Sequence, residues 1–236
     1  MVEIVTVADR DALVAKAAQD IQEVVAAVRE NGGRHGDGIA RIVLTGGGAG
    51  IGTLNALAAQ GAEFGDVHFF FGDERNVPVT DPESNQGQAT AALKAIGADP
   101  ARVHGYHLGE LNLEQATRAY NEILAEFAPK GFDLHLLGMG GEGHINSLFP
   151  HTDALAESEQ LVVAVYHSPK PPAERVTLTL PAVHNSAEVW LLVSGAEKAE
   201  AAAAVVNHAD GQQWPAAAAN ATRLYLADDA AGELHS

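Results

Sequence analysis

The chain has 236 residues, of which 47% are hydrophobic and 19% are charged. This length and balance predict one sizeable globular unit or two small ones, and they exclude a wholly disordered chain. The absence of cysteine excludes disulfides and thiolate chemistry. A formal net charge of −17 disfavours nucleic acid and anionic membranes as partners. We see no secretory signal and no apolar run long enough to span a membrane, so we expect a soluble, cytoplasmic protein.

Strand and helix patterns alternate along the chain. Residues 3–7 (EIVTV) predict a strand, Asp9 is placed to cap the helix that follows, and Asn31-Gly32-Gly33 ends that helix. Further strands are expected at 39–45, 66–72, 132–138, 161–166, 175–180, 188–194 and 223–227, and further helices at 53–60, 86–96, 111–128 and 196–207. This alternation predicts one α/β domain over residues 1–236, with a mostly parallel, twisted, Rossmann-like sheet and helices on both faces.

Three loops that carry glycine or acidic residues follow three apolar strands. They are TGGGAGIG at 45–52, GDERNVP at 72–78 and GMGGEGHINSLFPH at 138–151. Ligands of open α/β sheets bind beyond the carboxyl ends of the strands. If the three strands are parallel neighbours, the three loops meet at one edge of the sheet, and we expect the functional site there.

The first of these loops has the composition of an anion-binding turn. Glycines let backbone N–H groups approach a phosphate closely, and a following helix offers unpaired N–H groups. The loop has no dinucleotide-binding Gly spacing, and Thr53 stands where a Walker A loop needs lysine. A tight strand-to-helix turn without a ligand explains the glycines equally well.

The second loop places Asp73 and Glu74 beside Arg75. A solvated ion pair is one interpretation. The other is functional, because the guanidinium of Arg75 can grip a phosphate or carboxylate with two hydrogen bonds, and Asp73 can act as a base or orient one.

The third loop contains the strongest candidate for a catalytic residue. His144 lies among four glycines directly after a strand, and imidazole titrates near neutrality, as a general base requires. His104 and His107 form an HxxH pair without a third ligand, so we expect no metal and no cofactor. His135 alternates into a strand and is predicted to lie in the core. The chain has neither a G-x-S-x-G nor an H-E-x-x-H motif, which disfavours the corresponding serine and zinc hydrolases.

In these loops the sequence resembles the 6-phosphogluconolactonase family, which shares a superfamily with glucosamine-6-phosphate deaminases. The resemblance rests on TGGGAG at 45–50, DERNVP at 73–78 with ESN at 83–85, GMGGEGHINSLFP at 138–150, KPPAERVTLTLP at 170–181 and SGAEKAEA at 194–201. The chain departs from the family pattern in having Gly141-Glu142 in place of Pro-Asp. It also has Thr45 and Gly48 where the family usually has Ser and a hydroxyl or Arg residue.

The resemblance implies a NagB-type fold and hydrolysis of 6-phospho-D-glucono-1,5-lactone to 6-phospho-D-gluconate, the second step of the oxidative pentose phosphate pathway. His144 would take a proton from the attacking water, and Asp73 would orient the site or the imidazole. The phosphate would be held by Arg75, Lys198 and the first loop (Thr45, Gly46, Gly47 and Gly48), while Arg175 would stabilise the oxyanion or bind the other end of the substrate. We expect a small sugar phosphate as partner, and a monomer or homodimer.

Two other functions stay open on the sequence alone. One is an amino-sugar-phosphate deaminase or isomerase on the same scaffold. Its relatives continue from Gly-His into Ala-Phe-Asn-Glu-Pro, whereas this chain has Ile145-Asn146-Ser147-Leu148-Phe149-Pro150. The other is a non-catalytic sugar-phosphate sensor, which has no need of a base.

Overall fold

The centre of the fold is a parallel sheet. The computed structural model describes residues 2–234, and within them seven strands pair in parallel with each of their neighbours. Their order across the sheet is β1 (Glu3–Val7), β10 (Arg223–Ala227), β9 (Ser186–Val193), β6 (Phe132–Gly138), β2 (Arg41–Leu44), β3 (His68–Phe71) and β5 (Val103–His104). The strands β6, β2 and β3 are therefore adjacent, and their carboxyl ends lie at one edge.

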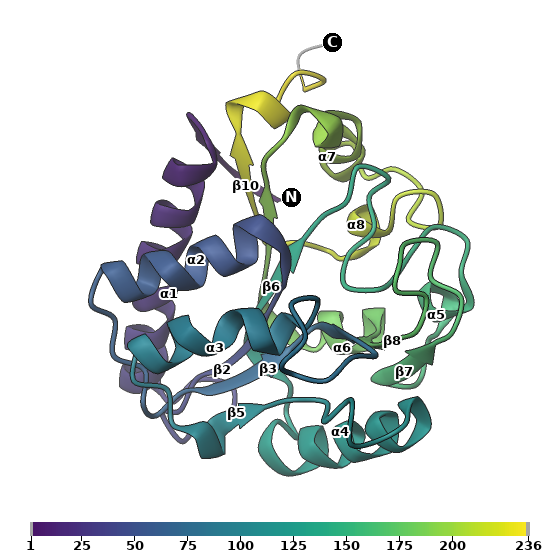
Figure 1. Ribbon diagram of the computed structural model, residues 1–236. Coiled ribbons are helices and arrows are strands. Elements are labelled where there is room, and N and C mark those ends of the chain that lie inside the picture. Colours follow the sequence, from purple (N-terminus) through teal and green to yellow (C-terminus); the bar gives the residue numbers. More distant parts are fainter. Residues whose placement is uncertain (1, 235–236) are drawn as a thin grey trace.

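Helices cover both faces of this sheet (Figure 1). On one face lie α1 (Arg10–Asn31), α2 (Gly47–Ala59) and α3 (Asn85–Ala95). On the other lie α5 (Asp153–Ala156), α6 (Leu180–His184), α7 (Ala199–Val206) and α8 (Pro215–Ala218). Short 3-10 turns stand at Pro100–Arg102, Ala196–Lys198 and Asp228–Ala230. The predicted fold class, an α/β domain with a mostly parallel sheet, is confirmed.

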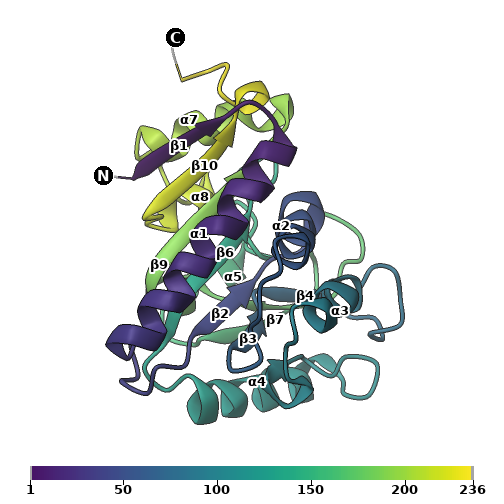
Figure 2. The same cartoon turned by 90° about the vertical axis from the view of Figure 1, so that its left-hand side faces the viewer.

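The longest helix, α1, runs alongside β10 and β9 in the opposite direction (Figure 2). Its first turn is capped by Asp9, whose carboxylate accepts the N–H of Ala12 at 2.8 Å. It ends at Gly32, which adopts the left-handed conformation with φ 92°. Both ends agree with the sequence prediction. Between them the apolar side chains recur at helical spacing and are buried against the sheet, among them Leu13 and Ile21.

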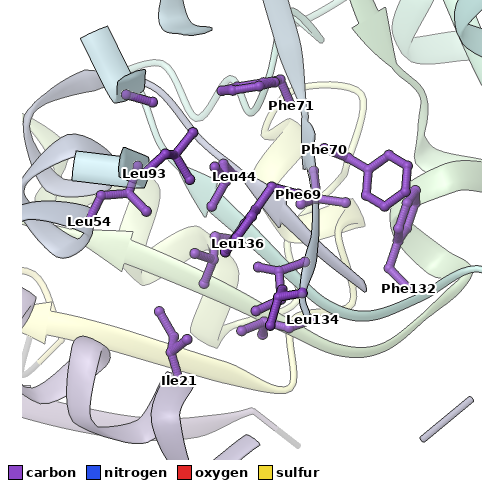
Figure 3. Close-up of a cluster of buried hydrophobic side chains, with 14 of the residues drawn as sticks. Ile21, Leu44, Leu54, Phe69, Phe70, Phe71, Leu93, Phe132, Leu134 and Leu136 are labelled. Carbon is purple, nitrogen blue, oxygen red and sulfur yellow. The ribbon is translucent and has the colours of Figure 1, made fainter. Parts of the chain in front are cut away.

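The strands beside the site are buried on both faces, as their continuous apolar sequences predict. In Figure 3, Phe70 of β3 lies beside Phe132 of β6, with ring centroids 5.2 Å apart in an edge-to-face arrangement. Leu44, Leu54 and Leu93 gather on the opposite side of the strand. This packing fixes the carboxyl ends of the strands, and therefore the loops that leave them.

A second, smaller sheet departs from the sequence prediction. It consists of β4 (Asp73–Arg75), β8 (Arg175–Leu178) and β7 (Val162–Val165), paired antiparallel in that order. We expected residues 73–75 to be loop and the two later strands to belong to the main sheet. The pairing places Arg75 directly opposite Arg175. The helix α4 (Leu113–Phe127) packs against this small sheet.

The glycine run after β2 also differs from the prediction. We expected a loop as far as residue 52, but α2 begins at Gly47, and only Gly46 stands outside the helix as its N-cap. A Cβ on Gly50 would lie 2.1 Å from the carbonyl oxygen of Thr45. The first turn of α2 therefore packs directly on the end of β2, at a separation that only glycine allows. Within residues 2–234, no helix is long and apolar enough to cross a membrane.

Candidate active site

The three loops identified in the sequence meet at the carboxyl edge of β2, β3 and β6. They surround a pocket of about 150 Å³. All nine residues that the sequence analysis selected line this one pocket: Thr45, Gly46, Gly47, Gly48, Asp73, Arg75, His144, Arg175 and Lys198. The three loops therefore converge at one edge of the sheet, as expected. The roles assigned to the nine residues stay predictions.

The first loop presents the amino end of α2 to the pocket. The N-cap residue Gly46 has no side chain to accept the first helical N–H groups. These donors and the positive end of the helix dipole therefore favour an anion. The Thr45 hydroxyl accepts the N–H of Gly138 at 3.0 Å and so joins the ends of β2 and β6. A Cβ on Gly46 would lie 2.1 Å from the side-chain oxygen of Asn85, so the loop packs tightly on the start of α3.

Glu74, in the second loop, has a structural role. Its buried carboxylate accepts the N–H groups of Arg75, Asn85 and Gln86, all at 2.8 or 2.9 Å, and the hydroxyl of Ser84 at 2.9 Å. Burial raises the pKa of Glu74, and these hydrogen bonds oppose that rise. The carboxylate thus ties β4 to the first turn of α3 and holds Arg75 at the rim of the pocket.

The guanidinium of Arg75 is only partly engaged in hydrogen bonds. Its Nη1 donates to the carbonyl oxygen of Glu83 at 2.7 Å and to Oδ1 of Asn85 at 2.9 Å. Its Nε is buried and has no hydrogen-bond partner among residues 2–234. Buried donors are almost always paired in folded proteins, so an unpaired one beside a pocket indicates a ligand.

Asp73 is held by neighbours other than the imidazole. Ser147 donates its hydroxyl to Oδ2 of Asp73 at 2.6 Å, and the amide nitrogen of Asn85 donates to Oδ1 at 2.9 Å. Nη1 of Arg175 lies 3.9 Å from Oδ2 and compensates the buried charge. Among the described residues, the carboxylate hydrogen-bonded to His144 is that of Glu142. Orientation of the site or of the imidazole by Asp73 stays a prediction.

The imidazole of His144 is fixed on two sides. Its ring stacks on Phe149 with centroids 4.5 Å apart, and its Nδ1 lies 3.1 Å from Oε1 of Glu142. The backbone of the turn also packs closely against the ring, because a Cβ on Gly140 would lie 2.1 Å from Nδ1 of His144. Burial lowers the pKa of His144, and the Glu142 carboxylate partly offsets this effect. The imidazole is therefore neutral near pH 7, the state that a general base needs.

Lys170, which we did not select from the sequence, lies beside this pair. Its Nζ is 2.9 Å from Oε1 of Glu142. Partial burial opposes ionisation of Glu142, but the Lys170 hydrogen bond outweighs it with help from other contacts, and the pKa of Glu142 is lowered. An ionised Glu142 accepts a proton donated by Nδ1 of His144. This assigns the proton to Nδ1 and leaves the lone pair on Nε2.

Arg175 and Lys198 differ in how far their charges are engaged. Nε of Arg175 donates to the carbonyl of Pro172 at 3.0 Å, and Nη2 donates to those of Lys170 and Pro171 at 3.1 and 3.2 Å. This leaves Nη1 as the part of the guanidinium that no backbone carbonyl engages. The ammonium group of the half-buried Lys198 has no hydrogen bond or ion pair with any group in residues 2–234, although its backbone N–H donates to the carbonyl oxygen of Gly195 at 3.0 Å.

Two asparagines that we did not select also line the pocket. Asn85 joins the second loop to α3 through the contacts described above. Asn146 adopts a left-handed conformation with φ 49°, and both polar atoms of its buried amide lack partners among the described residues. Asn146 lies two positions after His144 in the third motif, and Asn85 ends the ESN segment. Their positions within these motifs could have identified the two asparagines as site residues. An amide side chain by itself, however, does not indicate a particular chemical role.

The remaining histidines in the described part of the chain do not form a metal site. Nδ1 of His68 lies 2.8 Å from Nε2 of His104, and both rings are buried. His135 is fully buried, as predicted, and neither ring nitrogen has a partner in the described part of the chain. Residues 2–234 contain no group of three or more potential ligands that could hold a metal ion.

The fold and the site together define an α/β protein of the NagB type, whose functional pocket lies at the carboxyl edge of a seven-stranded sheet. The chain matches the model of the glucosamine-6-phosphate isomerase/6-phosphogluconolactonase family over residues 8–227, and it belongs to that family.

Curated relatives and a solved structure agree with this assignment. The 6-phosphogluconolactonase of Mycobacterium tuberculosis is 47% identical, with 97% of this chain and 96% of the relative covered. That of Mycobacterium leprae is also 47% identical, with 92% and 90% covered. The crystal structure of 6-phosphogluconolactonase from Thermotoga maritima superposes with a TM-score of 0.83 at 25% identity, covering 96% of this chain and 98% of that one.

Proposed function

We propose that this protein hydrolyses 6-phospho-D-glucono-1,5-lactone to 6-phospho-D-gluconate. The observation that carries the proposal is the neutral His144 imidazole in one small pocket with an uncapped helix N-terminus and the unsatisfied donors of Arg75 and Lys198. A base and an anion site in the same pocket suit an ester that carries a remote phosphate. The 47% identity to mycobacterial 6-phosphogluconolactonases over nearly the whole chain supports the same substrate.

The substrate phosphate is bound by the amino end of α2. The N–H groups of Gly47 and Gly48 donate to its oxygens, and Arg75 and Lys198 supply positive charge from either side. Local cations are essential here, because a chain with a net charge of −17 repels a dianion at long range. Binding at the phosphate fixes the lactone ring against the imidazole, so that binding energy lowers the barrier of the chemical step.

His144 acts as the general base. Its Nε2 takes a proton from water while the water oxygen bonds to the lactone carbonyl carbon. Nδ1 donates to Glu142, which stabilises the imidazolium that forms. Collapse of the tetrahedral intermediate breaks the bond to the ring oxygen, which receives the proton from Nε2 and becomes a hydroxyl. Nη1 of Arg175 is the donor available to the oxyanion or to the far end of the sugar.

The magnitudes are adequate for such a substrate. General base catalysis supplies about 10²- to 10⁴-fold acceleration, and an oriented oxyanion donor supplies about 10²- to 10³-fold more. A lactone is an activated ester that opens slowly in water, so no covalent nucleophile is required.

The decisive experiment measures proton release from freshly prepared 6-phosphogluconolactone, with and without protein, corrected for spontaneous opening. We expect a large catalysed rate with the wild-type chain. A parallel incubation with glucosamine 6-phosphate should release no ammonia. Lactone decay at the spontaneous rate, or release of ammonia, would overturn the proposal.

A further inference from the structure

We propose that Arg10, the first residue of α1, is an additional ligand of the substrate phosphate and occupies the position that a side chain at Gly48 would fill. The inference rests on the proposed function, because it assigns one more contact to that phosphate. It concerns a residue distant in sequence from all three loops, and Arg10 does not line the central pocket itself.

The contact between Arg10 and the first loop is direct. A Cβ built on Gly48 would lie 3.1 Å from Nη1 of Arg10. The guanidinium therefore covers the first turn of α2 where the chain has three successive glycines and no side chain to offer. Gly48 does not have a positive φ, so the backbone there does not itself demand glycine.

The side chain of Arg10 has no other engagement in the described chain. It makes no hydrogen bond, ion pair or ring contact with any of residues 2–234, although Asp9 and Asp11 flank it. The Asp9 carboxylate is occupied in capping α1. A cation in the first turn of a helix is also unfavourable, because the helix dipole is positive there. Local helix stability therefore gives no reason for an arginine at this position.

The surface around Arg10 is continuous with the central pocket. Gly48, Ala49 and Lys198 line both the central pocket and a more open cavity of about 500 Å³, whose wall includes Arg10. An anion seated on the N–H groups of α2 therefore lies next to a cavity that both Lys198 and Arg10 line. Movement of a flexible arginine side chain brings its guanidinium to that anion.

The charges at this mouth explain why a further cation is needed. Besides Arg10 and Lys198, the outer cavity is lined by the carboxylates of Asp9, Asp11, Glu197 and Asp229. Such a rim repels a phosphorylated substrate unless cations close to its path compensate. The exposed Arg10 side chain supplies such a cation beside Gly48.

The test is the variant Arg10→Ala, assayed with two substrates. With 6-phosphogluconolactone we expect KM to rise about tenfold while kcat changes less than about twofold, as for loss of one charge-assisted hydrogen bond in binding. With unphosphorylated gluconolactone we expect no change in kcat/KM. The matched control is Arg118→Ala, an exposed arginine on α4 that lines none of the pockets described here.

A double variant tests the claim that Arg10 replaces a side chain at Gly48. In the Arg10→Ala background, Gly48→Ser should recover part of the lost affinity, because the hydroxyl then occupies the vacated space. In the wild-type background the same serine displaces the guanidinium and should not improve KM.

Affinity for 6-phosphogluconate, measured by calorimetry, separates this inference from the proposed function. An absence of lactonase turnover in the wild type overturns the proposed function. If Arg10→Ala binds 6-phosphogluconate as tightly as the wild type does, the inference about Arg10 is overturned whatever the turnover. An equal loss of kcat/KM with the unphosphorylated lactone also contradicts it, since that effect cannot arise at a phosphate.

Discussion

Nδ1 of His144 lies 3.1 Å from Oε1 of Glu142, a carboxylate only two residues earlier in the same turn. The orienting group of the proposed base is thus local, whereas Asp73 holds Ser147 and Asn85. Burial lowers the pKa of His144, and since Lys170 contacts the same carboxylate, an anion and a cation beside the ring act on that pKa in opposite directions.

Removing the proposed base should abolish most of the turnover. We expect His144→Gln to lower kcat for 6-phosphogluconolactone by about 10²- to 10⁴-fold, because glutamine cannot accept a proton. Affinity for 6-phosphogluconate and the melting temperature should change little, since the side chain still fills the space above Phe149. The control is His167→Gln, at an exposed histidine that does not line the pocket. Near-normal kcat in His144→Gln would exclude this residue as the base.

The pH profile should report the opposing effects of Glu142 and Lys170. Glu142 raises the pKa of His144, and Lys170 lowers it. Glu142→Gln should therefore move the acid limb of the kcat/KM profile to lower pH, and it should also reduce the plateau, because the tautomer is no longer fixed. Lys170→Met should move the acid limb to higher pH. Shifts in the same direction would contradict this account of the site.

Arg75→Lys tests the phosphate assignment by keeping the charge and removing the planar fork. Lysine cannot reproduce the hydrogen bonds to Glu83 and Asn85 and also reach a ligand. We expect about a tenfold increase in KM for 6-phosphogluconolactone with kcat nearly unchanged. Arg118→Lys is the matched control. An unchanged KM in Arg75→Lys would remove Arg75 from the phosphate site.

Acid should destabilise the fold through His135. Complete burial lowers the pKa of His135 to about 3. Unfolded histidine titrates near pH 6.5, so between these values the unfolded chain binds one proton more than the folded chain. This contribution to stability is complete above pH 6.5 and is lost as pH falls, by about 1.4 kcal/mol per unit.

His135→Leu should remove this pH dependence. The free energy of unfolding by urea, measured from pH 7 to pH 4.5, should fall less steeply in the variant by about 1.4 kcal/mol per unit. At pH 7 the variant should be at least as stable as the wild type, because the two buried ring nitrogens lack partners. A slope equal to that of the wild type would show that His135 is already protonated in the folded protein.

Much of the scaffold was predictable because local signals and burial agree. Apolar runs such as 132–138 are strands, and the capping residue Asp9 and the terminating Gly32 mark both ends of α1. The adjacency of β6, β2 and β3 then brought the predicted loops together. Here pattern, capping and topology all favoured the same fold.

The predictions failed where tertiary contacts determine the local structure and the side-chain partners. Asp73–Arg75 is a strand because it pairs with β8, a partner about a hundred residues away that no local pattern indicates. The contact between Glu142 and the imidazole was not anticipated, because it depends on the path of a four-glycine turn. Asn146 was missed because an unpaired amide becomes visible only when its surroundings are known.

The glycines of the first loop differ in what a side chain at each position would contact. At Gly46 and Gly50 a methyl group would collide with Asn85 and with the Thr45 carbonyl, whereas at Gly48 its nearest neighbour is the end of the flexible Arg10 side chain. A descendant of this protein that had lost all turnover would still have to keep the first two in order to fold. Retention of those two glycines in a homologue therefore indicates only that the fold is the same. The residues at positions 10 and 48 are the ones that bear on the proposed phosphate contact.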